Sequence, residues 1–276
     1  PIFEPGRRHG DFWRMGRALF AAGFRKGDIV HNTFSYHLTP AVHMMEAGAH
    51  ACGCIIIPAG IGNTEQQIEA ITQLKPSKYV GTPSFLRILL EKADSLGVDV
   101  SSITHGAVGG EALPPSLRDY FKERDVVVLQ AYGTADIGLI AYESNAIEGM
   151  IVDEEIILEI VRPGTGQPLP VGEVGEVVVT SLNPYYPLIR FATGDLSALL
   201  PGGSPCGRTN TRIKGWMGRA DQTTKVKGMF VHPKQIAQVV ERHAEISRAR
   251  LVVDNQNHVD LMTLHCEVNR ATEGLA

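Results

Sequence analysis

Two glycine-containing segments in the first half of the chain carry residue types that could bind a nucleotide. Residues 130–136, Gln-Ala-Tyr-Gly-Thr-Ala-Asp, follow an apolar run and present an aromatic ring, a glycine, a hydroxyl and a carboxylate. These groups could stack on a base, admit a substrate, contact a phosphate and hold Mg²⁺. Residues 106–111, Gly-Ala-Val-Gly-Gly-Glu, could let a flat ligand lie against bare backbone, because glycine has no side chain. Each segment taken alone also fits an ordinary turn.

Two later segments carry charged groups that suit the same kind of ligand. Residues 190–195, Arg-Phe-Ala-Thr-Gly-Asp, leave a predicted strand and end at a carboxylate, which can accept hydrogen bonds from two ribose hydroxyls. Residues 218–221, Gly-Arg-Ala-Asp, precede Lys-Val-Lys-Gly at 225–228 and could form a hinge with a cation near a phosphate. A surface turn and a solvated hairpin edge would explain the same residues.

Helical and strand patterns alternate up to residue 130, and this alternation would place the first two segments. Helices are predicted over residues 11–23, 40–51, 64–74, 84–96 and 115–123, with apolar strand patterns at 28–34, 54–58, 79–81, 103–108 and 126–130. Thr64 is expected to be the N-cap of its helix. Such alternation predicts an α/β fold with a mainly parallel sheet and flanking helices. Ligands of open α/β sheets bind outside the carboxyl ends of the strands, where three of the four segments lie.

The pattern changes after Gly149 to short strands separated by turn residues, at 156–161, 175–180 and 188–191. We expect a β-rich subdomain over about residues 151–215. Past Gly218 a third region begins, with strand patterns at 223–227, 250–253 and 259–268 and a helix at 233–242. The sequence therefore predicts a core of residues 1–218 and the start of a small α+β C-terminal part over 219–276.

The composition is that of a globular protein, with 43% hydrophobic and 20% charged residues. A formal net charge of −4 offers no general attraction for nucleic acid or for an anionic membrane. No apolar run approaches the length of about 18 residues that a membrane span needs. Four scattered cysteines form no disulfide pattern, which favours the cytoplasm. Because the chain begins with Pro1 and no terminal element is evident over 271–276, we expect truncation at both ends.

In type, order and spacing, these segments resemble the adenylate-forming superfamily of acyl-CoA synthetases, and most closely the phenylacetate-CoA ligase branch. The resemblance covers nearly the whole chain and rests on residues 34–38, 58–65, 81–84, 109–111, 132–136, 190–195, 206–208 and 218–228. Asn-Thr-Glu at 63–65 and Cys-Gly-Arg at 206–208 favour the phenylacetate branch over the others.

The resemblance implies a role for each matching residue. Those that would bind ATP, AMP or coenzyme A are Gly109, Gly110, Glu111, Tyr132, Gly133, Asp195 and Gly228. Among them, Tyr132 would stack on adenine, Asp195 would bind the ribose hydroxyls and Gly228 would let the pantetheine arm of coenzyme A pass. Those that would act in catalysis are Thr134 near the α-phosphate, Asp136 on Mg²⁺, Arg219 on ribose or phosphate, and Asp221 as the hinge of the C-terminal lid. Tyr36 and His37 would form a wall of the carboxylate pocket.

The implied reaction is the AMP-forming ligation of a small, phenylacetate-like carboxylate to coenzyme A. The acid would attack the α-phosphorus of ATP, and after lid rotation the coenzyme A thiol would attack the acyl-adenylate. Two alternatives stay open, namely an adenylating enzyme with another acceptor and a nucleotide-binding homologue without catalysis. We expect Tyr132, Asp136, Asp195 and Arg219 to converge on one nucleotide, and relatives of this kind often form homodimers.

The sequence departs from the family pattern in four places. The phosphate-binding loop would precede Pro1 and the catalytic lysine of the lid would follow Ala276. Ala135 and Asp136 replace a hydroxyl residue and a glutamate, and the shorter carboxylate would need a water bridge or a shifted backbone to reach Mg²⁺. Some relatives have further ligands near the Cys-Gly-Arg segment, but Cys206 stands alone here, so we predict no structural zinc.

Overall fold

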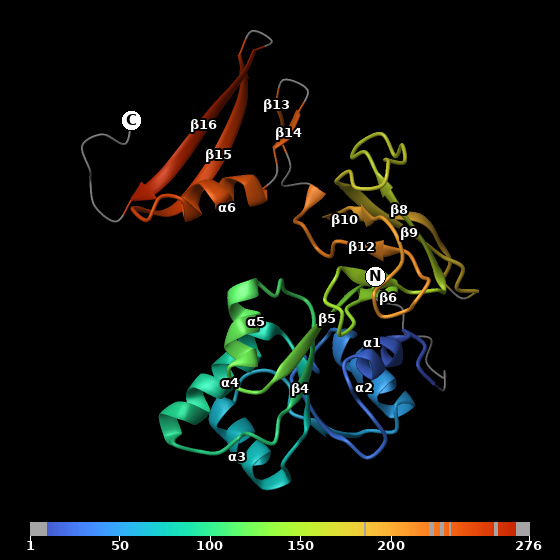
Figure 1. Ribbon diagram of the computed structural model, residues 1–276, viewed down its shortest axis with the longest axis vertical. Helices are drawn as coiled ribbons and strands as arrows, with labels where there is room; N and C mark the ends of the chain where they lie inside the picture. The colour runs from blue at the N-terminus through green and yellow to red at the C-terminus, as the bar shows by residue number, and fades with distance from the viewer. Residues whose placement is uncertain are drawn as a thin grey trace.

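A nine-stranded sheet forms the centre of the computed structural model (Figure 1), in the order β11-β12-β7-β6-β5-β4-β3-β1-β2. The structure describes residues 10–184, 186–220, 224–226, 229–231, 233–256 and 259–268. The parallel strands are β1 (Ile29–Asn32), β2 (Ile55–Pro58), β3 (Lys78–Gly81), β4 (His105–Val108) and β5 (Val127–Thr134). Antiparallel strands continue the sheet beyond β5, namely β6 (Gly138–Tyr142), β7 (Met150–Val152), β12 (Arg212–Ile213) and β11 (Leu199–Leu200).

Helices cover both faces of the parallel strands (Figure 1). On one face lie α1 (Met15–Ala21) and α2 (Ala41–Ala51), and on the other α3 (Thr64–Leu74), α4 (Pro83–Leu96) and α5 (Pro115–Lys122). Neighbouring residues of a strand point to opposite faces, so Leu129 packs in the core under α1 and α2 while Val128 packs under the other three helices. Burial on both faces explains why these strands are continuous apolar runs in the sequence.

A separate antiparallel sheet has the order β10-β9-β8, with β8 (Ile156–Val161), β9 (Gly175–Ser181) and β10 (Leu188–Ser197). Val177 and Val179 of β9 pack against Ile140 and Met150 of the large sheet in one apolar cluster. The two sheets therefore share a core, and β10 is brought close to β5 at their ends.

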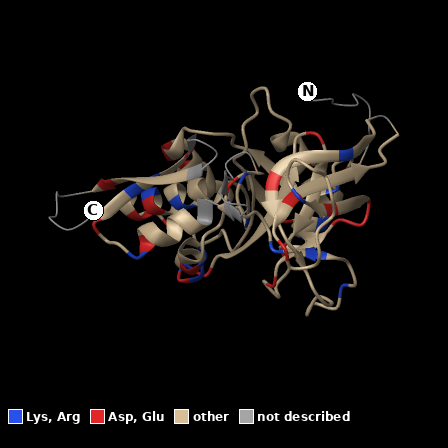
Figure 2. Ribbon diagram, turned by 90° about the horizontal axis from the view of Figure 1, so that it is seen from above, with Lys and Arg blue, Asp and Glu red and all other residues tan. Residues whose placement is uncertain are grey.

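The C-terminal region contains α6 (Pro233–Glu241) and two hairpins. They are formed by β13 (Thr224–Val226) with β14 (Met229–Val231), and by β15 (Ile246–Gln256) with β16 (Val259–Val268). In Figure 2 the Lys and Arg residues are interspersed with Asp and Glu over both ends of the molecule. No helix of the described residues is long and apolar enough to span a bilayer, and the longest, α4, has 14 residues.

The structure corrects several predicted boundaries. The helix predicted from residue 11 begins at Met15, because Arg14 has a left-handed φ of 63° while the Asp11 carboxylate accepts the Met15 N–H at 3.0 Å. The N-cap of α3 is Asn63, and Thr64 is the first helical residue. Strands β5 and β10 run on beyond the predicted strand ends at 130 and 191, because the antiparallel partners β6 and β9 pair with them. The predicted β-rich range is split between the two sheets, and the boundary at 218 and 219 stays a prediction.

Candidate active site

The site begins at two glycines that follow β4. Gly109 donates its N–H to the Gly81 carbonyl at 3.1 Å, and a Cβ at this position would lie 2.8 Å from the Ala131 carbonyl oxygen of β5. Gly110 has a φ of +77°, which favours glycine. At Gly109 the backbone therefore passes β5 too closely for a side chain.

Tyr132 of β5 and Asp195 of β10 come together from different sheets. The Tyr132 hydroxyl donates to Asp195 Oδ2 at 2.9 Å, and both residues are buried, with 8% and 9% of their surfaces exposed. Burial raises the pKa of Tyr132, and the negative charge of Asp195 raises it further. The phenol thus stays a hydrogen-bond donor, and this hydrogen bond holds the Tyr132 ring beside the Asp195 carboxylate.

Two further donors reach the other oxygen of Asp195. The Trp216 indole Nε1–H donates to Oδ1 at 3.0 Å, and the Arg219 guanidinium donates to the same atom at 3.4 Å. Gly194 allows this approach, because a Cβ there would lie 2.6 Å from Arg219 Nη2. The sequence analysis did not single out Trp216; the available signals were its position two residues before Gly218 and the presence of only two tryptophans in the chain.

These residues line a cavity of about 310 Å³. Its lining contains six of the residues predicted to bind or act on the nucleotide, namely Gly110, Glu111, Tyr132, Gly133, Asp195 and Arg219. Of the four side chains expected to converge, three therefore share one cavity. The fourth, Asp136, lies in the turn after β5, where its Oδ1 accepts a hydrogen bond from the Tyr186 hydroxyl at 3.3 Å.

A second cavity of about 250 Å³ adjoins the first and shares Gly110, Ala131 and Gly133 with it. Gly109 and Thr134 also line it. The rest of its wall is largely apolar and comes from α1, α2 and the chain before α2, including Met15, Phe34, Pro40, Ala41, Met44 and Met45. No residue in this lining carries a charged side chain.

Like Asp136, two further predicted site residues that the structure describes line neither cavity. Tyr36 donates its hydroxyl to Glu46 Oε1 at 2.6 Å, and burial together with this carboxylate raises the pKa of Tyr36. His37 is exposed in the same loop, and neither residue lines the two cavities. Asp221 and Gly228 lie outside the described residues.

Residues 9–184 match the family described as AMP-binding enzyme. The chain belongs to this family. The chain is 30% identical over 270 residues to the phenylacetate-coenzyme A ligase of Aromatoleum evansii, covering 94% of this chain and 61% of that protein. It is 31% identical over 264 residues to the phenylacetate-coenzyme A ligase of Thermus thermophilus, covering 92% of this chain and 59% of that protein.

The chain thus spans about three fifths of the length of these curated relatives. Among solved structures, an open conformation of 2-hydroxyisobutyryl-CoA ligase in complex with 2-HIB-AMP and CoA has a TM-score of 0.81 and 24% identity to it. That match covers 93% of this chain and 62% of the other. The predicted resemblance and fold class are both confirmed.

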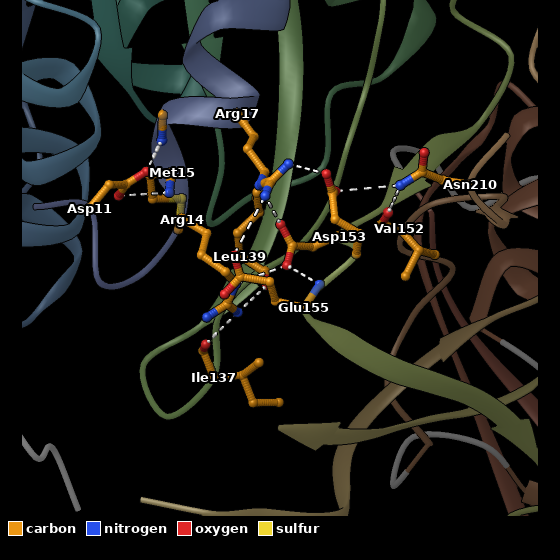
Figure 3. Close-up of polar contacts among 12 residues, drawn as sticks. Asp11, Arg14, Met15, Arg17, Ile137, Leu139, Val152, Asp153, Glu155 and Asn210 are labelled. Atoms are coloured by element: carbon orange, nitrogen blue, oxygen red, sulfur yellow. Dashed lines mark hydrogen bonds and ion pairs between the residues drawn. The ribbon is translucent and has the colours of Figure 1, made fainter. Parts of the chain in front are cut away.

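The ion pair of Arg14 and Asp153 lies beside the turn that follows β5, and Arg14 also binds that turn (Figure 3). Arg14 donates from Nη2 to the carbonyls of Ile137 and Leu139 at 3.0 Å each, and from Nε to Asp153 Oδ1 at 2.8 Å. The Asp153 side chain is fully buried. Burial raises the pKa of Asp153, while the charge of Arg14 opposes that rise. The sequence analysis missed this pair, because its members are separated by 139 positions.

The Cys-Gly-Arg segment lies in the exposed loop between β11 and β12. The pKa of Cys206 is lowered to about 6, first by the Ser204 hydroxyl at 3.0 Å and then by the backbone of Arg208. Within the part of the chain that the structure describes, no group of three or more His, Cys, Asp and Glu residues could hold a metal ion. The prediction that zinc is absent stays a prediction.

Proposed function

We propose that this chain is part of an AMP-forming ligase that joins a small, phenylacetate-like carboxylate to coenzyme A through an acyl-adenylate. The observation that carries the proposal is the pair of adjoining cavities. One is lined by Tyr132, Asp195 and Arg219, and the other is apolar. A carboxylate in the apolar cavity and the α-phosphate of a nucleotide in the other would meet at the backbone that both cavities share.

The cavity lined by Tyr132, Asp195 and Arg219, called the nucleotide cavity below, has a group suited to each part of a nucleotide. Tyr132 offers an aromatic ring for the base, and Gly109, Gly110 and Glu111 provide the neighbouring backbone edge. Asp195 is the carboxylate for the ribose hydroxyls. Arg219 is a fixed positive charge that would stabilise negative charge developing on the phosphate during adenylation.

The apolar cavity defines the class of acid. Methionine side chains adapt to irregular shapes, and Phe34 adds an aromatic surface, so Met44, Met45 and Phe34 suit a flat hydrocarbon tail. An acid with a second charge would leave that charge without a partner among the lining residues, which is costly in an apolar site. We therefore propose an aromatic or short aliphatic monocarboxylate, and we keep Tyr36 and His37 only as an outer wall.

The last residue of β5 and the turn after it fit the Mg²⁺ ion that ATP chemistry implies. Asp136 supplies a carboxylate and Thr134 a hydroxyl, and Mg²⁺ is usually bound by one or two carboxylates together with substrate phosphates. When bound, the ion would polarise the phosphoryl oxygens. The Tyr186 hydroxyl orients the Asp136 carboxylate, which is shorter than the glutamate of the family pattern.

In the second half-reaction, the thiol of coenzyme A would attack the acyl carbon, and AMP would leave. We propose that residues 219–276 are the start of the lid that turns between the two steps, with Asp221 as hinge and Gly228 beside the pantetheine arm. The four cysteines are free, which agrees with a cytoplasmic enzyme. Assembly as a homodimer stays a prediction.

The test is pyrophosphate release by the intact gene product, measured with phenylacetate and a panel of other carboxylic acids, with and without coenzyme A. We expect ATP-dependent turnover with aromatic monocarboxylates, completed only when coenzyme A is present. Asp195→Asn should weaken AMP binding about 10- to 100-fold, since each hydrogen bond to a charged group contributes roughly 1.5–3 kcal/mol. Turnover without consumption of coenzyme A would indicate another acceptor, and AMP binding without any turnover would indicate a non-catalytic homologue.

A further inference from the structure

Trp216 is a large aromatic side chain placed at the nucleotide cavity and half exposed. It lines the cavity together with Tyr132 and Asp195, and 45% of its surface is exposed. A ring of this size is usually well buried, and one that stays open beside a polar cavity has an apolar face available to a ligand. The other tryptophan, Trp13, lies in the core under α1 with 9% of its surface exposed.

Backbone hydrogen bonds to β10 hold the segment that carries Trp216. The N–H of Met217 donates to the Leu196 carbonyl at 2.9 Å, and the N–H of Leu196 donates to the Gly218 carbonyl at 2.8 Å. On the other side, the Ser197 hydroxyl donates to the Gly215 carbonyl at 2.7 Å. Hydrogen bonds on both sides of Trp216 therefore hold it next to Asp195. The pairing of residues 215–218 with β10 positions the indole beside the carboxylate.

The carboxylate of Asp195 is shared among three donors. Tyr132 donates to Oδ2, while Trp216 and Arg219 both donate to Oδ1. A carboxylate offers about four lone-pair positions, so roughly one position is left for a ligand. Two ribose hydroxyls need two positions. The Arg219 contact, at 3.4 Å, is the longest of the three, so we expect the ribose to replace it first. Tyr132 and Trp216 would then hold one oxygen each while the ribose binds.

We propose that Trp216 forms the second aromatic wall of the nucleotide site and, through its indole N–H, positions Asp195 to bind the ribose hydroxyls. The proposal rests on the proposed function, because it assumes that the cavity of Tyr132 and Asp195 takes a nucleotide. It gives the ring a contact with the nucleoside, and it gives the N–H a separate role that acts through Asp195.

Fluorescence can report the contact directly, because the chain has only two tryptophans. In a Trp13→Phe variant of the intact gene product, with Phe also at any tryptophan outside residues 1–276, Trp216 is the only tryptophan emitter. Titration with AMP should change its emission in a saturable way, with the same midpoint that calorimetry gives for AMP binding. In Trp216→Phe, which retains Trp13, the emission should stay unchanged while AMP still binds.

Two substitutions separate the ring from the N–H. Trp216→Leu removes both, and AMP should bind about tenfold more weakly, since stacking of a base on an aromatic ring contributes roughly 1–3 kcal/mol. Trp216→Phe keeps a ring but leaves Asp195 without one donor. Its AMP affinity should fall by about threefold, and its preference for AMP over 2′-deoxy-AMP should shrink, because a misplaced carboxylate gains less from the ribose hydroxyl.

The outcomes distinguish this proposal from the proposed function. If wild-type protein does not bind AMP in calorimetry, the proposed function fails, and this inference fails with it. If AMP binds but the emission of the Trp13→Phe variant does not respond, and both Trp216 variants keep wild-type affinity and the same preference for AMP over 2′-deoxy-AMP, then Trp216 has no part in binding. Unfolding curves of each variant show whether a lost affinity comes from a lost fold.

Discussion

Cys206 is an exposed thiol whose neighbours favour its ionised form. Ser204 Oγ lies 3.0 Å and Arg208 Nη1 3.6 Å from its sulfur, and the pKa of Cys206 is lowered to about 6. Cys52 and Cys54 pack at the core, and there burial has the opposite effect. It raises the pKa of Cys54 to about 11 and also raises the pKa of Cys52. The three thiols therefore differ in the pH at which each becomes a nucleophile.

We predict that Cys206 is alkylated fastest, because the thiolate is the reacting species. The rate with iodoacetamide should rise through a midpoint near pH 6 and level off above it, while Cys52 and Cys54 stay slow over the same range. Peptide mass spectrometry after timed reaction measures all three sites in one sample. Ser204→Ala should move the Cys206 midpoint upward, since the Ser204 hydroxyl is the largest cause of the shift. A wild-type midpoint at the ordinary thiol value would contradict the geometry of this loop.

At the scale of elements, the sequence predicted those parts of the fold whose pattern is local. The parallel strands β1 to β5 and the helices between them each carry their own apolar periodicity, and the structure has all of them. Strands β6, β7, β11 and β12 were missed, because their antiparallel pairing depends on partners elsewhere in the chain. The same reason applies within the site. Tyr132 and Asp195 were found through their motifs, whereas Trp216, Arg14 and Asp153 act through contacts that no local pattern reveals.

The turn between β4 and α5 gives an element-scale prediction. A Cβ on Gly109 would lie 2.8 Å from the Ala131 carbonyl oxygen, which is backbone and cannot rotate away. We expect Gly109→Ala to lower the free energy of unfolding by about 1–3 kcal/mol, the usual cost of overpacking, and to weaken AMP binding by pushing β4 and β5 apart. Gly203→Ala is the matched control, because an added Cβ there meets no atom within 4 Å and should change stability by less than about 0.5 kcal/mol. Urea unfolding and AMP calorimetry on both variants measure the difference, and equal effects would disprove the close approach.

At the scale of the whole molecule, the Arg14–Asp153 ion pair joins the residue before α1 to the residue that follows β7. Arg14 also holds the carbonyls of Ile137 and Leu139, so one guanidinium links α1, the turn that carries Asp136, and the end of β7. We expect Arg14→Leu to lower the free energy of unfolding by about 3 kcal/mol at neutral pH, because it removes the nearer of the two guanidinium groups that pair with a buried carboxylate. The other, Arg17, has its Nε 3.5 Å from Asp153 Oδ2. Arg87→Leu, which breaks an exposed pair with Glu91 on α4, is the matched control and should unfold at close to the wild-type urea midpoint.

The pH dependence separates the ionic part of this loss from lost packing. Arg14 lowers the pKa of Asp153 against the effect of burial, so removing Arg14 raises the pKa of Asp153 in the folded state further above its unfolded value. A carboxyl whose pKa is raised on folding binds its proton more tightly in the folded protein, so the folded state gains stability as the pH falls through that raised pKa. The deficit of Arg14→Leu relative to wild type should therefore shrink from neutral towards mildly acidic pH in urea unfolding. The part that remains at acidic pH measures the lost bonds to Ile137 and Leu139 and the lost packing. A deficit that stays constant with pH would mean that Asp153 does not carry the buried charge, and the link between α1 and the turn after β5 would then rest on the two carbonyls alone.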